Sequence, residues 1–182
     1  MPNVKTISKL DAACSQLETA IRLFSQEGDE VSIHTLACAA YEMIHTISKR
    51  RGRKKPLMFD SDLVDKRYRD KFTVHLKKAA GFFKHADHDT DGTIQFDPTI
   101  SEMFIMFALL GLGSMEIPVS PYGHGFLMWF QIIHPNTLTD QGKKELLKFF
   151  SVEQLVEVRS LSRSEFFETA LPSHNPRAFI KI

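Results

Sequence analysis

Three aspartates stand at alternate positions of a polar stretch and could together hold a divalent cation. Asp87, Asp89 and Asp91 take positions 1, 3 and 5 of an EF-hand-like loop. Gly92 then takes position 6 of the loop. Position 12 requires a bidentate glutamate, but Pro98 stands there. The interpretation we favour is an acidic connecting turn, and the alternative is a loop that binds a divalent ion weakly.

A second set of potential ligands lies at offsets of 4, 8 and 11 along one expected helix: His34, Cys38, Glu42 and His45. These offsets keep the four side chains near one face. A single straight helix cannot surround a tetrahedral ion with four ligands, and zinc requires that geometry. We therefore favour a semi-polar helix face packed against a neighbour, and we predict no cofactor.

A third set could cleave RNA. Arg69 would hold a phosphate, His75 would transfer a proton, and Asp70 is the polar companion of the arginine. On one regular helix six residues turn about 600°, so the two side chains point about 120° apart. The pair would converge only across a helix break or with help from a second subunit. The alternative is an exposed arginine and a half-buried histidine.

A basic run fills six of the seven positions from 49 to 55: Lys49, Arg50, Arg51, Arg53, Lys54 and Lys55. The whole chain has a net charge of only +1, so the other residues sum to −5 and the run is a local patch. It follows the expected end of a helix, where cations stabilise the helix dipole. A solvated helix end is the interpretation we favour, and contact with RNA or DNA phosphates is the functional alternative.

The elements that position these residues are expected to be helices. Apolar residues spaced 3 and 4 apart predict a first helix from about Ile7, with Gly28 just past its end. Asp29 is predicted to cap a second helix that ends near Gly52 and forms an antiparallel hairpin with the first. A third helix is expected over about 63–85.

The later helices are predicted from capping signals and apolar runs. Asp97 and Pro98 predict the start of a fourth helix, apolar nearly all round and therefore central. A short helix is expected over 126–133. Capping boxes at Ser151 and Ser162 then predict two of two or three short helices, with a loose end from residue 172. The predicted fold class is all-α, an antiparallel bundle of four to five main helices. Residues 1–115 are expected to form the core, and 116–182 to pack on it in the same domain.

The expected bundle with Arg69, Asp70 and His75 resembles the HEPN superfamily over about residues 1–115. The resemblance implies a small helical bundle, often a homodimer, that is either a metal-independent ribonuclease or an inactive relative. In this register Arg69 and His75 would be catalytic. A second register supplies His85 as the motif histidine, with Ala80 and Gly81 in the arginine and polar slots. That register implies an inactive member without its phosphate-binding arginine.

Composition further narrows the classes of protein to which this chain can belong. The 182 residues are 43% hydrophobic and 25% charged, which suits one globular domain rather than a disordered chain. Two cysteines exclude a disulfide scaffold, and the longest apolar stretch, 103–112, is too short for a membrane span. We expect a cytoplasmic protein away from membranes. Three hypotheses remain: a bundle that binds RNA or DNA, a HEPN-type ribonuclease, and a protein-interaction module with a weak divalent-ion loop.

Overall fold

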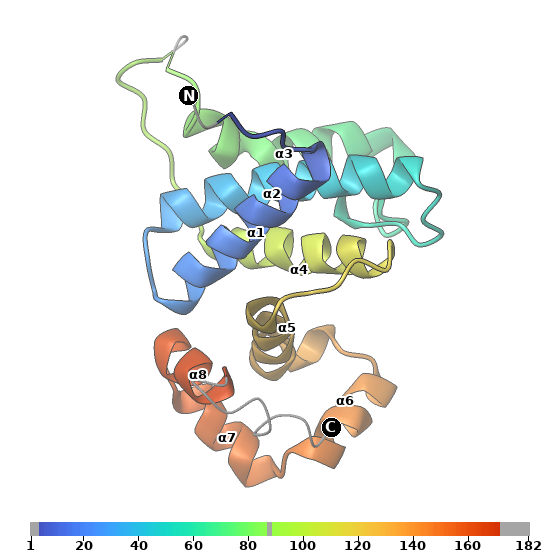
Figure 1. Ribbon diagram of the computed structural model, residues 1–182, viewed down its shortest axis with the longest axis vertical. Coiled ribbons are helices and arrows are strands. Elements are labelled where there is room, and N and C mark those ends of the chain that lie inside the picture. Colours follow the sequence, from blue (N-terminus) through green and yellow to red (C-terminus); the bar gives the residue numbers. More distant parts are fainter. Residues whose placement is uncertain (1–3, 87–88, 172–182) are drawn as a thin grey trace.

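The computed structural model describes residues 4–86 and 89–171, and within them the chain forms only helices, turns and loops (Figure 1). The all-α prediction is confirmed. The α-helices are α1 (Lys9–Ser25), α2 (Glu30–Arg50), α3 (Arg69–Phe82), α4 (Thr99–Gly113), α5 (Pro121–Ile133), α6 (Asp140–Phe149), α7 (Val152–Ser160) and α8 (Arg163–Ala170). The 3-10 helices are η1 (Met58–Asp60), η2 (Lys66–Tyr68) and η3 (Pro135–Thr137).

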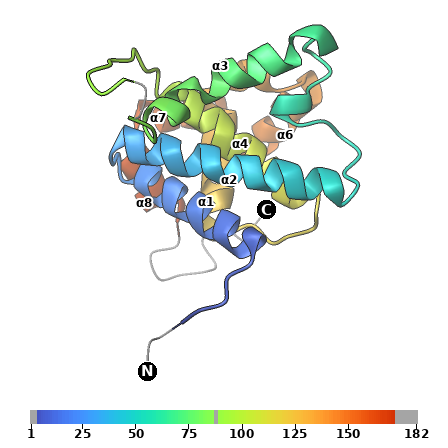
Figure 2. The ribbon, with the colours of Figure 1, turned by 90° about the horizontal axis from the view of Figure 1, so that it is seen from above.

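Helices α1 and α2 form the predicted hairpin and lie side by side in both ribbon views (Figures 1 and 2). Asp29 caps α2, because its side chain accepts a hydrogen bond from Ser32 N at 2.7 Å. The residue with left-handed backbone after α1 is Glu27, with φ of 53°, and Gly28 follows it. Gly28 N donates to Leu23 O at 2.9 Å, so the glycine is the second residue past the cap.

Helix α4 occupies the centre of the bundle, as its apolar circumference predicts. Phe104, Ile105 and Ala108 are fully buried, and the helix packs against α2, α1 and α5. It begins at Thr99, whose backbone N–H donates to Asp97 Oδ1 at 3.0 Å. The N-cap is Pro98 rather than the predicted Asp97, so the helix starts one residue later than predicted, and Asp97 accepts this hydrogen bond from its position one residue before the cap.

The prediction that α3 starts near residue 63 is wrong by six residues. The chain from 58 to 68 forms η1 and η2, and α3 starts at Arg69. Aspartate side chains in this stretch bond to nearby backbone, as when Asp65 Oδ1 accepts from Arg67 N at 2.9 Å. Such local bonds compete with helical hydrogen bonds and favour short turns.

The C-terminal helices α6, α7 and α8 lie beyond α5, at the end of the molecule opposite α3 (Figure 1). Helix α5 starts at Pro121, five residues before the predicted position. The helix includes Gly123 and Gly125, and a Cβ on Gly123 would lie 2.5 Å from Val119 Cγ1, so a larger residue would not fit there without a shift. Both predicted capping boxes are confirmed, at Ser151 and Ser162. The predicted loose end from residue 172 lies outside the described residues.

The hydrophobic core runs through both groups of helices. Phe24 of α1 contacts the rings of Phe126 and Trp129 on α5 and of Phe167 on α8. Across the part of the chain that the structure describes, no helix combines the length and apolarity needed to cross a bilayer. The two cysteines are not bonded to each other.

Candidate nucleic-acid interface

The basic run begins where α2 ends in a specific turn. Gly52, with φ of 81°, donates its N–H to Lys49 O at 3.1 Å, and Arg53 N donates to Ser48 O at 3.1 Å. These two bonds make a Schellman motif, which satisfies the last helical carbonyls and reverses the chain. The reversal directs the side chain of Arg53 back under the loop that it starts.

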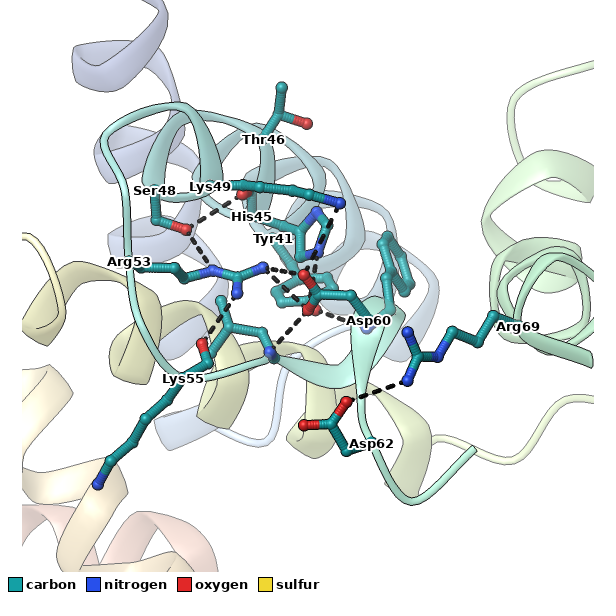
Figure 3. Close-up of polar contacts among 12 residues, drawn as sticks. Tyr41, His45, Thr46, Ser48, Lys49, Arg53, Lys55, Asp60, Asp62 and Arg69 are labelled. Carbon is teal, nitrogen blue, oxygen red and sulfur yellow. Dashed lines mark hydrogen bonds and ion pairs between the residues drawn. The ribbon is translucent and has the colours of Figure 1, made fainter. Parts of the chain in front are cut away.

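Arg53 is the most constrained cation of the run. Its Nη2 donates to both carboxylate oxygens of Asp60, at 2.9 and 2.7 Å, and its Nε donates to Ser48 Oγ at 3.0 Å. The Nη1 donates to Lys55 O at 2.9 Å, and the side chain is 3% exposed (Figure 3). A guanidinium enclosed by four acceptors cannot also bind an external phosphate. Arg53 therefore positions the loop, and the sequence prediction that it contacts nucleic acid loses its geometric basis.

Asp60 is the partner of Arg53, and we call this pair of residues the anchor of the loop. Burial alone would raise the pKa of its carboxyl, but the hydrogen bond from Leu57 N at 2.8 Å and the charge of Arg53 outweigh burial and lower the pKa. Lys49 Nζ also lies 3.9 Å from Oδ2. The Asp60 carboxylate thus lies near two cations, Lys49 and Arg53. The bonds between Arg53 and Asp60 join the two ends of the loop formed by residues 53–60.

The anchor rests on α2. Tyr41 is fully buried, and its hydroxyl accepts a hydrogen bond from Phe59 N at 3.1 Å. His45 Nε2 lies 3.3 Å from Asp60 Oδ1 but makes no hydrogen bond. Burial lowers the pKa of His45, although the neighbouring Asp60 acts in the opposite direction. The imidazole is therefore mainly neutral at neutral pH, and it packs beside Asp60 without adding a charge.

A second arginine–aspartate pair fixes the next part of the chain. Arg69 Nη2 donates to Asp62 Oδ1 at 3.1 Å, and its Nε donates to Val64 O at 3.0 Å (Figure 3). These bonds hold the segment between η1 and η2 against the first turn of α3. They also occupy the guanidinium that the ribonuclease hypothesis assigns to phosphate binding.

The predicted catalytic residues lie on or next to one unbroken helix. Arg69, Asp70 and His75 are all in α3, so Arg69 and His75 diverge by about 120°. His75 is exposed, and Asp70 is exposed on another side of the helix. In the second register Ala80 is buried in the core and His85 is exposed just past the end of α3. Within one chain neither register assembles an arginine–histidine site.

The remaining basic side chains face solvent. We define the basic surface as the exposed lysines and arginines of α2, the loop, η2 and α3: Lys49, Arg50, Arg51, Lys54, Lys55, Lys66, Arg67, Lys71 and Lys78. Figure 2 shows how the chain passes from the end of α2 through the loop to α3 along one side of the molecule. The surface thus joins segments that a local reading of the sequence treats separately.

The sequence does indicate this larger surface, because the excess of basic residues extends well beyond residues 49–55. Residues 49–84 contain thirteen lysines and arginines and four aspartates, a formal charge of +9 in a chain of +1. The rest of the protein is therefore −8. Two of the four aspartates, Asp60 and Asp62, are paired with Arg53 and Arg69, and only the first pair is largely enclosed.

The predicted metal-binding residues do not form a described site. Asp87 lies outside the described residues, whereas Asp89 and Asp91 are exposed. Among the residues that are described, no group of three or more histidine, cysteine or acidic side chains is arranged to hold a metal ion. On α2, burial and the nearby Glu42 raise the pKa of the Cys38 thiol to about 12, which leaves it protonated.

Comparisons with known proteins add no relative from which a function could be carried over. A scan against protein-family models, a search of curated proteins and a search of solved structures found no match to this chain. The HEPN resemblance stays a prediction. A function can therefore be inferred only from the charge and geometry of the basic surface.

Proposed function

We propose that this protein binds nucleic acid through the basic surface, largely without regard to sequence. The observation that carries the proposal is the ion pair between Arg53 and Asp60. This pair fixes the loop, and the other cations of the loop are exposed to solvent. A solvated helix end needs no such arrangement. A fixed loop loses less conformational freedom on binding than a mobile one, so its charges are better prepared for phosphates.

The segregation of charge supports the same proposal. Positive charge is concentrated in residues 49–84 of a nearly neutral protein, which is a pattern expected of a phosphate-binding segment. Arg50, Arg51, Lys54 and Lys55 have no ion-pair partner within the described part of the chain. Such side chains are free to replace the counterions of a nucleic-acid backbone.

Binding without cleavage is the form of this function that we propose. Cleavage would need a phosphate-holding arginine close to a proton-transferring histidine. Arg69 is bonded to Asp62 and to Val64 O, and His75 points away from it on the same helix. The inactive form of the HEPN resemblance agrees with this proposal.

The proposal is tested with two variants of equal charge change. The binding variant carries Arg50→Gln, Arg51→Gln, Lys54→Gln and Lys55→Gln. The control variant carries Lys5→Gln, Lys9→Gln, Lys143→Gln and Lys144→Gln, which are exposed on α6 and at the start of the chain. Fluorescence anisotropy with labelled RNA and DNA at low salt gives the affinity of each.

We expect the binding variant to lose at least tenfold in affinity, and the control to lose much less. Both should unfold at nearly the wild-type temperature, because exposed substitutions usually change stability by about 0.5 kcal/mol or less. Equal losses in the two variants would mean that only net charge matters, and no binding by the wild type would refute the proposal.

A further inference from the structure

Five exposed side chains follow one line from the last residue of η2, whose backbone is already in the helical region, along the outer side of α3: Tyr68, Lys71, His75, Lys78 and Phe82. Their spacing of 3, 4, 3 and 4 keeps them on one helical stripe. At a rise of 1.5 Å per residue the stripe is about 21 Å long. Aromatic rings stand at its two ends and basic side chains stand between them. We call this set the α3 stripe.

The two aromatic side chains of the α3 stripe are not needed by the core. The opposite side of α3 supplies the buried residues, Leu76 and Ala80, and Phe72 packs beside them. Tyr68 is 56% exposed, and Phe82 is 37% exposed. Both rings are therefore accessible to another molecule, and they stand singly rather than in one apolar patch.

The electrostatic surroundings decide the chemistry of that molecule. The Arg67 guanidinium lies 5.7 Å from the centroid of the Tyr68 ring, and Lys71 follows one turn later. At the Tyr68 end, Asp65 is paired with Arg67, and Asp70 is off the stripe. A partner must therefore carry negative charge and also present flat apolar faces.

We infer that the α3 stripe binds single-stranded nucleic acid, with unpaired bases stacked on Tyr68 and Phe82 and phosphates at Lys71 and Lys78. This inference rests on the proposed function and names its substrate class. Base-on-aromatic stacking is available to every base, but only where the bases are not already stacked inside a duplex. The stripe therefore selects single strands over duplexes, while the loop at the end of α2 supplies further phosphate contacts.

The test compares Tyr68→Ala with Tyr68→Phe, which keeps the ring and removes only the hydroxyl. Phe82→Ala is a second variant at the far end of the stripe, and Leu63→Ala is a control because Leu63 is 97% exposed and lies off the stripe. The probes are an oligouridine and an oligothymidine of about 12 nucleotides, within the range of single-strand sites, and a duplex of equal length. Thermal unfolding confirms that each variant is folded.

We expect the wild type to bind the single strands more tightly than the duplex. Tyr68→Ala should weaken single-strand binding by about fivefold to a hundredfold, the range for loss of one stacked base. Tyr68→Phe and Leu63→Ala should bind like the wild type. Photocrosslinking of a 5-iodouracil oligomer, read by mass spectrometry, should place the crosslink at Tyr68 or Phe82. Tighter binding of the oligouridine would identify RNA as the preferred strand.

Two outcomes would overturn the inference in different ways. If Tyr68→Ala and Phe82→Ala bind as the wild type does while the four-cation variant at the end of α2 does not, the stripe is no stacking surface and the proposed function survives. If the wild type binds none of the three probes at low salt, the inference fails together with the proposed function.

Discussion

Helix α2 carries one histidine in each half, and the two halves lie in opposite surroundings. His34 is fully buried, with its Nδ1 3.0 Å from Ser101 Oγ and the rings of Phe96 and Phe104 against it. His45, three turns later, lies beside Asp60 and the buried guanidinium of Arg53. The first half of the helix packs in the apolar core, and the second half packs against the ion pair of Arg53 and Asp60.

These opposite surroundings explain how the fold produces a basic surface. In the first half burial keeps the imidazole neutral, and it lowers the pKa of His34 to about 4, with a smaller contribution from Lys84. In the second half burial is compensated by pairing, so a charged arginine and a charged aspartate stay inside the structure. Only the second arrangement holds a loop of cations at the surface.

The largest expected effect comes from breaking the anchor with Asp60→Ala. The substitution leaves the Arg53 guanidinium 3% exposed and without its carboxylate. We expect the free energy of unfolding to fall by about 3 kcal/mol, the lower end for a buried pair that loses one partner. Urea unfolding measures the change.

The matched control is Asp62→Ala, which removes the carboxylate of the second pair. Asp62 is 79% exposed, so its loss should lower the free energy of unfolding by less than about 1 kcal/mol. Similar losses in the two variants would contradict the distinction between an enclosed anchor and a surface pair.

The second-largest expected effect is a pH dependence of stability that comes from the first half of α2. An unfolded histidine titrates near 6.5, whereas His34 in the folded chain titrates near 4. Between these values only the unfolded state binds the proton, so stability falls as the pH falls. From about pH 7 to pH 5 we expect His34 to account for a loss of about 2 kcal/mol.

The Asp60 anchor responds in a different pH range. The pKa of Asp60 is lowered in the folded chain, so its contribution is complete above the unfolded value of about 4 and is lost only below it. Unfolding measured against pH should therefore lose its slope between pH 7 and 5 in His34→Gln, with the smaller contribution of His45 remaining. A slope unchanged by His34→Gln would show that His34 is not the titrating group.

Most of the fold could be predicted because its helices carry their own patterns. The apolar spacing of α1 and α2, the apolar circumference of α4 and the capping boxes of α7 and α8 are all local in sequence. The start of α3 was missed because three aspartates in 60–65 bond to nearby backbone or arginine groups and replace a helix by turns.

The site was less predictable, since its decisive contacts join residues that no periodic pattern relates. The six cations of 49–55 look alike in the sequence, and only the fold distinguishes Arg53, which is enclosed by Asp60, from its exposed neighbours. Arg69 is similarly withdrawn by Asp62. The α3 stripe could not be predicted from the apolar spacing of this helix, because that spacing marks the buried positions and not the exposed ones.

The most direct test of the central claim is the salt dependence of binding to a single-stranded oligonucleotide. With three or four phosphate contacts, the slope of log affinity against log salt should be about −2 to −3 for the wild type. It should flatten by about 0.7 for each loop contact that is lost in the variant that lacks Arg50, Arg51, Lys54 and Lys55, where the contacts of Lys71 and Lys78 remain, and it should stay near the wild-type value in the matched lysine control. The same slope in all three proteins, or no binding at about 50 mM salt, would contradict the account.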